Sequence, residues 1–386
     1  MRTIVLYISG HGFGHASRDI ELINALCRRE PDLRIVVRTS APRWLFDLTV
    51  RPSGAIEFHH LETDTGIVQI DSLHLDAEAT VQRARAFMER LPGLIAAEGD
   101  YLREVGADLI VADIPALGIA AARAAGVPSI AIGNFTWDWI YSGYPGTDDL
   151  VESIGRHYQG AQLALRLPMH GGFSTFRNVR DVPFIARSSH RDPAETRRAL
   201  GFPLDERLVL VSFGGYGLEG LNLEALRGLD GYVAVVSGSV PLADLPSGLR
   251  GGRRGSLLPF DEPAMYAAGL GYEDVVRAVE VVVTKPGYGI IAECLANDTA
   301  LLYTSRGHFI EYDVLTREAP RFLRTGYIDH DDLFAGRWTT HLDALLSQPE
   351  PPERPSVDGA QVAADILLQS VEGRSPVARN ALDDQS

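Results

Sequence analysis

Short apolar runs alternate with longer helix-like stretches along almost the whole chain, and this alternation limits the possible folds more than any other feature. It is typical of a parallel sheet covered by helices, because each parallel connection needs a crossover that usually contains a helix. The first half contains the apolar runs TIVLYIS, RIVVRTS, IEFHHL, DLIVADI and SIAIGN. We therefore predict an α/β fold that begins with a doubly wound, Rossmann-like sheet.

A second series of the same kind follows a linker that is rich in charge and proline, RNVRDVPFIARSSHRDPAETRRALGFP. Its apolar runs are RLVLVSFGG, GYVAVVSGS, AVEVVVTKPG and TALLYTS. Since 386 residues exceed the size at which one core usually divides, we predict two Rossmann-like domains, residues 1–185 and 186–356. A helix over 357–371 and a disordered tail over 372–386 complete the expected organisation. Ligands bind at the carboxyl ends of such strands, so we expect the site in the cleft between the domains.

Composition excludes several classes of partner. A net charge of -15 opposes binding to nucleic acid and docking on anionic lipid. No apolar run approaches the roughly 20 residues of a membrane-spanning helix, and the N-terminus resembles a strand more than a signal peptide. The two cysteines, Cys27 and Cys294, cannot form a disulfide framework, which favours a reducing cytoplasm. We expect small-molecule ligands and no integral membrane association.

A loop with three glycines and two histidines, GHGFGHASR at residues 10–18, separates the first predicted strand from the first helix. Gly10, Gly12 and Gly14 permit a sharp turn and a close approach of backbone to a ligand. The dinucleotide fingerprint needs G-x-G-x-x-G and an acid at the end of the second strand, where this chain has Arg38–Ser40. No P-loop motif occurs either. A tight strand-to-helix turn without a ligand remains an open alternative.

The second half contains a more specific pattern in VEVVVTKPGYGIIAECLAND. Lys285 and the N–H groups after Pro286 and Gly287 form a positive helix start that suits a diphosphate. Glu293 lies in the first or second turn of that helix, where a carboxylate can bridge two ribose hydroxyls. Stabilisation of the helix dipole is the alternative explanation for this acid.

The glycine loop, the helix and Glu293 resemble the donor-binding segment of inverting glycosyltransferases with the two-Rossmann GT-B fold. Similar segments occur in the peptidoglycan N-acetylglucosaminyltransferase and in monogalactosyldiacylglycerol synthase. The chain also resembles the N-terminal, glycosyltransferase-like region of plant L-arabinokinase across nearly its full length. The matching motifs, in order, are GHGFGHASR, GNFTWDWIY, RLP, FRNVRDVP, FGG and KPGYGIIAECLA. The kinase half of the plant protein has no counterpart here, so the resemblance does not imply kinase activity.

The resemblance implies a donor site for a nucleotide-diphosphate sugar, with UDP as the favoured nucleotide. Glu293 would hold the ribose, Glu311 would contact sugar hydroxyls, and the backbone near Gly271 and Tyr272 would read the base. Glycine loops would approach the ligand closely. The full set of predicted donor residues is Gly12, Gly14, Gly214, Gly215, Gly271, Tyr272, Lys285, Gly287, Gly289, Glu293 and Glu311. Gly214 and Gly215 can equally close a tight turn.

Inverting transfer is one displacement at the anomeric carbon, in which a base takes the proton of the acceptor hydroxyl. His15 is the predicted base from the resemblance and His11 is its rival, since histidine titrates near neutrality. Asp113, at the end of DLIVAD, would orient that histidine, although it can also cap the next helix. Helix dipoles and a cation would stabilise the leaving diphosphate, so we predict no cofactor and no metal.

The acceptor site is the least specified part. The segment NFTWDWIYSGY gathers aromatic residues, and we predict Trp137 and Asp138 as acceptor contacts, with core packing as the alternative. We predict a cytoplasmic glycosyltransferase that moves a sugar to a soluble glycan or small-molecule acceptor. A nucleotide-sugar epimerase or hydrolase on the same fold, and a non-catalytic nucleotide-sugar-binding protein, stay as alternatives. Turnover without an acceptor would identify the former, and binding without turnover the latter.

Overall fold

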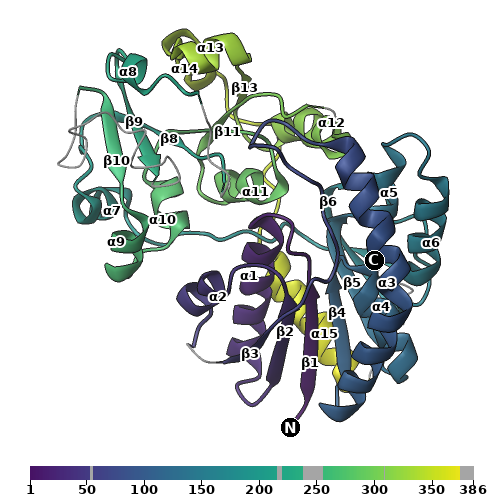
Figure 1. Cartoon of the computed structure of the whole chain (residues 1–386). Helices are drawn as coiled ribbons and strands as arrows, with labels where there is room; N and C mark the ends of the chain where they lie inside the picture. The colour runs from purple at the N-terminus through teal and green to yellow at the C-terminus, as the bar shows by residue number, and fades with distance from the viewer. Residues whose placement is uncertain (53–54, 215–219, 238–254, 308, 374–386) are drawn as a thin grey trace.

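The computed structural model describes residues 1–52, 55–214, 220–237, 255–307 and 309–373. It has two lobes, each built on one parallel sheet (Figure 1). We call the lobe around the first sheet the N-lobe and the lobe around the second sheet the C-lobe. The fold class predicted from the alternation of apolar runs and helices is therefore confirmed.

The N-lobe sheet has the strand order β3-β2-β1-β4-β5-β6-β7, and all of its strand pairs are parallel. Its strands are β1 (Thr3–Ile8), β2 (Arg34–Thr39), β3 (Ile56–His60), β4 (Leu109–Asp113), β5 (Ser129–Phe135), β6 (Leu163–Gly171) and β7 (Val179–Asp181). Its helices are α1 (Gly14–Arg29), α2 (Arg43–Thr49), α3 (Ala77–Glu104), α4 (Ala116–Ala125), α5 (Trp137–Ser142) and α6 (Asp148–Tyr158).

The C-lobe sheet has the order β10-β9-β8-β11-β12-β13, also in parallel pairs. Its strands are β8 (Arg207–Val211), β9 (Tyr232–Ser237), β10 (Leu257–Phe260), β11 (Val281–Thr284), β12 (Ala300–Tyr303) and β13 (Thr325–Tyr327). Its helices are α7 (Pro193–Leu200), α8 (Leu223–Leu226), α9 (Glu262–Ala267), α10 (Tyr272–Arg277), α11 (Tyr288–Ala296), α12 (Ile310–Glu318), the 3-10 turn Ala319–Arg321, α13 (His330–Ala335) and α14 (Thr339–Leu346).

The two sheets share the strand order of a dinucleotide-binding unit, with the third strand of each series at one edge and a reversal beside the first strand. The reversal falls between β1 and β4 in the N-lobe and between β8 and β11 in the C-lobe. The central strands are apolar and buried, since helices cover both faces of a parallel sheet. The reversal points therefore mark the crevices where such folds bind ligands.

The chain passes between the lobes twice, and the two passages lie side by side. The Phe184 N–H donates to the Ser356 carbonyl over 3.2 Å, and the Gly359 N–H donates to the Phe184 carbonyl over 2.9 Å. The final helix, α15 (Gly359–Val371), thereby returns to the N-lobe and packs against α1 (Figure 1). Residues 374–386, most of the predicted tail, lie outside the described residues.

An N-lobe segment between β3 and α3, residues 61–76, reaches into the C-lobe. Leu73 is buried in the apolar cluster of the C-lobe sheet, and the Ser72 hydroxyl donates to the Phe213 carbonyl over 2.9 Å. The Lys285 ammonium donates to the Gln69 side-chain oxygen over 3.1 Å. This segment joins the lobes on the side where their strands end. None of the helices in the described part of the chain is long and apolar enough to span a membrane.

Candidate active site between the lobes

The two glycine loops predicted from the sequence meet at the interface of the lobes. The N-lobe loop connects β1 to α1, and the C-lobe loop connects β11 to α11. A Cβ atom placed on Gly289, in the first turn of α11, would lie 3.4 Å from the Cα atom of Gly14, the first residue of α1. This is an ordinary van der Waals distance, so the two helix starts lie side by side. Gly12 has a φ of +68°, a backbone conformation that favours glycine.

His15 and Asp113 are in direct contact, although 98 positions separate them. His15 lies in the first turn of α1, Asp113 ends β4, and both side chains are buried. Their Nδ1 and Oδ1 atoms are 2.9 Å apart. Burial alone would raise the pKa of Asp113, but the Arg18 guanidinium and His15 together hold that pKa well below its usual range. The carboxylate is therefore ionised and able to orient the imidazole.

Arg18 is the residue of this cluster that the sequence analysis missed. Its Nε donates to Asp113 Oδ2 over 2.5 Å, and its Nη1 donates to Asn134 Oδ1 over 2.7 Å. Its Nη2 lies 2.8 Å from His15 Nδ1 and also binds Asp113 Oδ1. A guanidinium can only donate and an ionised carboxylate can only accept. His15 Nδ1 thus lies against both an obligate donor, Arg18 Nη2, and an obligate acceptor, Asp113 Oδ1. With Nδ1–H directed at Asp113, Nε2 is the ring nitrogen left to accept a proton.

His11 has a different arrangement, which separates it from His15 as a candidate base. The Ile67 N–H donates to His11 Nδ1 over 3.2 Å, so the proton of the neutral ring is on Nε2. Burial and the nearby Arg306 guanidinium lower the pKa of His11 well below its usual range. The ring is thus a neutral hydrogen-bond donor in this conformation. The geometry favours His15 as the base.

Asp64 is a second carboxyl group in the neighbourhood of His15 that the sequence analysis did not select. It accepts hydrogen bonds from the Ser9 hydroxyl over 3.0 Å and from the Trp137 indole N–H over 2.8 Å. Burial raises the pKa of Asp64 to about 6. It follows β3 in the segment HHLETDT, and only its position at a strand end could have identified it.

The C-lobe loop offers an anion site at the start of α11. Gly287 precedes this nine-residue helix as its N-cap, so the first N–H groups of the helix have no partner within it. Lys285 directly follows β11 and begins the connection to α11. Burial, assisted by the nearby charge of Arg306, lowers the pKa of Lys285 to about 7. A lysine with a pKa near 7 takes up a proton readily when an anion binds beside it.

Glu293 is buried in the second turn of α11 and binds Arg187, from the linker between the lobes. The Arg187 Nε donates to Glu293 Oε1 over 2.5 Å, and its Nη2 contacts the same oxygen. The Arg187 guanidinium also lies 5.6 Å from the centre of the Tyr272 ring. Burial raises the pKa of Glu293, and the Arg187 charge opposes that shift. The carboxylate is thus held in place by a residue that no sequence pattern singled out.

The predicted base-reading residues lie near this pair. The Tyr272 hydroxyl donates to the Ser212 hydroxyl over 2.5 Å, at the end of β8. The Gly271 N–H donates to Asp274 within the cap of α10, so this N–H cannot also donate to a nucleobase. Only the Gly271 carbonyl, as an acceptor, can contact the nucleobase. Gly214, with a φ of +74°, follows β8 at the same edge. Gly215 lies outside the described residues.

Glu311 makes a contact between the lobes. It is buried in the first turn of α12, and the Asn134 amide donates to its Oε1 over 2.8 Å. Asn134 in turn accepts from Arg18, which binds Asp113. A continuous chain of hydrogen bonds therefore connects the His15 dyad with the C-lobe residue predicted to contact the sugar.

Trp137 and Asp138 differ from the prediction that they contact an acceptor. The segment turns into helix α5 at Trp137, which is 2% exposed and stacks on Tyr141 with ring centroids 5.7 Å apart. Asp138 is buried, and its two oxygens accept from the Trp139 N–H and the Thr175 hydroxyl. Both side chains form part of the N-lobe core, as the packing alternative expected. The polar atoms of both side chains already have hydrogen-bond partners inside the lobe, which explains the difference.

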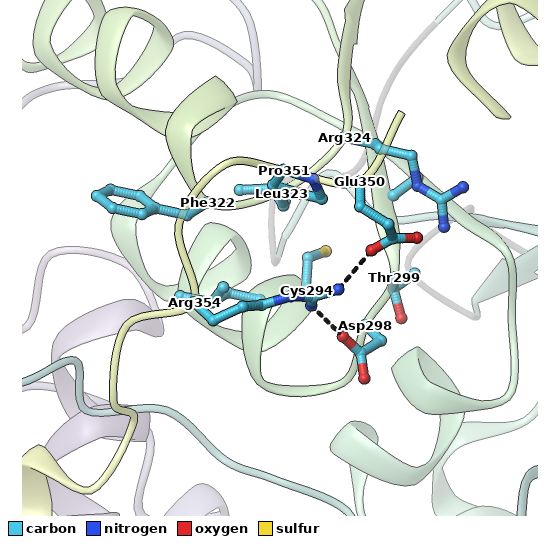
Figure 2. Close-up of a pocket in the computed structure, with 11 residues that line it drawn as sticks. Cys294, Asp298, Thr299, Phe322, Leu323, Arg324, Glu350, Pro351 and Arg354 are labelled. Carbon is cyan, nitrogen blue, oxygen red and sulfur yellow. Dashed lines mark hydrogen bonds and ion pairs between the residues drawn. The ribbon is translucent and has the colours of Figure 1, made fainter. Parts of the chain in front are cut away.

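A cavity of about 440 Å³ lies in the C-lobe, away from all these residues (Figure 2). It borders the amino ends of β12 and β13, and Arg354 pairs with Asp298 and Glu350 along its wall. None of the predicted site residues lines it. Within the described ranges, no group of three or more His, Cys, Asp and Glu side chains is arranged to hold a metal ion.

Comparison with known proteins agrees with this architecture. No family model matches the chain. L-Arabinokinase of Arabidopsis thaliana is 29% identical over 376 residues, which are 95% of this chain and 34% of that protein. The chain therefore spans about a third of the length of this curated relative.

Solved structures of similar shape are glycosyltransferases. The kitacinnamycin glycosyltransferase has a TM-score of 0.62 at 16% identity, with 95% of this chain and 98% of that chain covered. The calicheamicin glycosyltransferase CalG4 has a TM-score of 0.59 at 18% identity, with 97% and 99% covered. MurG of Acinetobacter baumannii has a TM-score of 0.54 at 12% identity, with 96% and 100% covered. The chain thus has the two-domain GT-B fold of glycosyltransferases and resembles, over nearly all its length, a third of a plant L-arabinokinase.

Proposed function

We propose that this protein is an inverting glycosyltransferase that uses a nucleotide-diphosphate sugar, with UDP as the favoured nucleotide. The observation that carries the proposal is the meeting of two helix starts. One places the His15–Asp113 pair, and the other offers an anion site at Gly287 with Lys285 beside it. A proton acceptor and a diphosphate site at one interface are what a single displacement at an anomeric carbon requires.

In this mechanism, the acceptor hydroxyl gives its proton to Nε2 of His15 while its oxygen attacks the anomeric carbon. The bond between that carbon and the diphosphate oxygen breaks, and the electron pair leaves with the diphosphate. Lys285 and the start of α11 receive the new negative charge without a metal ion. Asp113 stabilises the imidazolium that forms. One displacement inverts the anomeric configuration.

The donor residues divide between the nucleotide and the sugar. Glu293, oriented by Arg187, is positioned to bind ribose hydroxyls, with Tyr272 beside it. Glu311 is expected to exchange its hydrogen bond from Asn134 for hydroxyl groups of the sugar. We place domain boundaries at 185/186 and 356/357, and we propose a cytoplasmic protein with a soluble glycan or small-molecule acceptor. Its two described cysteines are unpaired and buried, which suits that compartment.

The test is a calorimetric screen of UDP, dTDP, GDP and ADP sugars, followed by incubation of the tightest-binding donor with an extract of small metabolites and glycans. We expect one donor to bind and its nucleoside diphosphate to be released only with an acceptor present. The anomeric configuration of the purified product, measured by NMR, reports inversion. Binding of no nucleotide sugar contradicts the proposal, and retention of configuration contradicts the mechanism.

A further inference from the structure

Several buried polar groups near the start of α12 and the end of α5 have no hydrogen-bond partner within the described part of the chain. Arg306, which follows β12, is 5% exposed, yet its Nε and Nη2 atoms are buried and unpartnered. Tyr144, after α5 in the N-lobe, is 7% exposed and has an unpartnered hydroxyl. Thr304, two positions before Arg306, has one as well. Buried polar groups are almost always hydrogen-bonded, so a cluster of exceptions indicates the place of a ligand.

These groups come together from both lobes. The Tyr144 hydroxyl is close enough to Arg306 for the guanidinium charge to oppose the rise in the tyrosine pKa that burial causes. The neighbouring backbone also meets there, since a Cβ atom on Gly143 would lie 3.4 Å from the Cβ of Ile310 in α12. The guanidinium lies 4.3 Å from the centre of the Phe309 ring, which holds its plane. The donors are thus positioned at the interface before any ligand binds.

The two unpartnered nitrogens specify the chemistry of the ligand. Nε and Nη2 lie on one edge of the guanidinium, where their N–H bonds are nearly parallel. This edge matches two oxygens of a carboxylate or of a phosphate. The Tyr144 hydroxyl, on the N-lobe side, is a further buried group without a partner among the described residues.

The charges around Arg306 leave this edge available. Burial and the Arg306 charge lower the pKa values of Lys285 and His11, and the Glu311 charge opposes the lowering of the Arg306 pKa by burial. Glu311, however, accepts its hydrogen bond from Asn134 and forms no ion pair with Arg306 among the described residues. The proposed diphosphate has its own cation, Lys285, and the start of α11 at the end of β11. Arg306 follows β12, one strand further on and beside the residue predicted to contact the sugar.

We propose that Arg306 and Tyr144 bind the carboxylate of a sugar acid, so that the substrate class of this site is a hexuronate. The inference rests on the proposed function. The carboxylate can belong to the donor, a nucleotide-diphosphate hexuronate, or to a hexuronate acceptor, and the experiment distinguishes these sources.

Calorimetry with UDP, UDP-glucose and UDP-glucuronate tests the donor arm on wild type, Arg306→Met and Tyr144→Phe. We expect wild type to bind UDP-glucuronate about tenfold to 100-fold more tightly than UDP-glucose. Arg306→Met is expected to remove that preference and Tyr144→Phe to reduce it about tenfold, while UDP affinity stays within about twofold. Arg198→Met, an exposed residue of α7, is the matched control and should behave as wild type.

The acceptor arm measures UDP release from UDP-glucose with free glucuronate added. Release that depends on glucuronate and on Arg306 assigns the carboxylate to the acceptor. A third readout needs no ligand: because Arg306 is buried without full pairing, Arg306→Met should raise the thermal midpoint of the free protein by about 1–4 °C.

Three outcomes would overturn the inference. The first is an equal loss of UDP and UDP-glucuronate affinity in Arg306→Met, which would make Arg306 a phosphate ligand. The second is a lower thermal midpoint in that variant. The third is no dependence on glucuronate in either arm. Failure of wild type to bind any nucleotide or nucleotide sugar would instead refute the proposed function itself.

Discussion

The starts of α1 and α11 face each other with similar glycine loops, but the hydrogen bonding of the charged groups around them differs. Around α1, Asp113 is bonded to both His15 and Arg18, and Arg18 is bonded to Asn134. Around α11, Lys285 is buried with a pKa of about 7, and Arg306 keeps two buried N–H donors without partners. The charged groups of the N-lobe site are bonded to one another, whereas two donor atoms of Arg306 in the C-lobe have no partner among the described residues.

Under the proposed function, this contrast assigns the proton acceptor to the N-lobe and donor binding to the C-lobe. A network whose hydrogen bonds are already made fixes the tautomer and direction of a base, and it stabilises the lobe. A buried guanidinium with unpartnered donors, such as Arg306, costs stability, and it recovers that free energy when a negative ligand binds. Substitutions in the N-lobe network should therefore reduce turnover and stability, and substitutions in the C-lobe should reduce binding.

His15→Ala should have the largest effect. Loss of the general base is expected to reduce kcat about 10²-fold to 10⁴-fold, while donor affinity stays within about twofold. His60→Ala, at the exposed end of β3, serves as control. Steady-state kinetics and calorimetry measure the two quantities. A donor affinity that falls as far as kcat would place His15 in the donor site and remove the contrast between the lobes.

Asp113→Asn should reduce both activity and folding stability. It leaves the Arg18 guanidinium buried without its counter-charge, which typically costs about 3–5 kcal/mol. Urea unfolding measures this loss. The double variant R18M/D113L removes both charges and should regain much of the stability but no activity. If Asp113→Asn unfolds at the wild-type urea concentration, the N-lobe network does not stabilise the fold.

Glu293→Ala should weaken donor binding about tenfold to 100-fold, since hydrogen bonds to a carboxylate are lost and Arg187 remains unpaired. Glu195→Ala, on the exposed surface of α7, controls for the loss of a carboxylate elsewhere in the C-lobe. Equilibrium binding of UDP measures the effect. Unchanged affinity would show that the ion pair with Arg187 is the whole role of Glu293.

The pH dependence of donor binding is expected to be the smallest of these changes for each unit of pH. Below pH 7 Lys285 is already charged, whereas above pH 7 the free protein must take up a proton to bind the diphosphate. Affinity should therefore fall as the pH rises from 7 to 9, by at most about tenfold per unit. Lys285→Arg, charged at every pH in this range, should give a flat profile. The same slope in both proteins would show that another group titrates.

Much of the fold could be predicted because its central strands are uninterrupted apolar runs. The nine strands expected from such runs are β1–β5, β8, β9, β11 and β12, and all are present. The sequence analysis missed β6, β7, β10 and β13. Pro168 lies in β6, Pro259 in β10 and Gly326 in β13, and β7 has only three residues. Pro and Gly interrupt the apolar pattern by which strands are predicted. Pro and Gly are tolerated in β10 and β13 because these strands lie at sheet edges, as β7 does.

The site was predictable where a residue ends a strand or begins a helix beside it. His15, Asp113 and Lys285 lie at or next to such a position, and Glu293 lies one turn further along α11. Arg18 and Arg187 did not stand out, because their partners lie 95 and 106 positions away and only the folded chain brings them together. Trp137 was assigned to the acceptor because aromatic residues at a strand end suit either a cleft or a core. Burial, which no local pattern encodes, decides between them.

The paired passages of the chain between the lobes, at Phe184 and Gly359, bear on how the two halves of the molecule can move. Two adjacent, hydrogen-bonded connections favour rotation about a single axis over torsion of one half of the molecule against the other. Under the proposed function, the lobes would open and shut along one path, and His15 and the start of α11 would return to the same alignment every time. Severing the backbone within residues 350–355 should release that constraint while leaving both sheets intact.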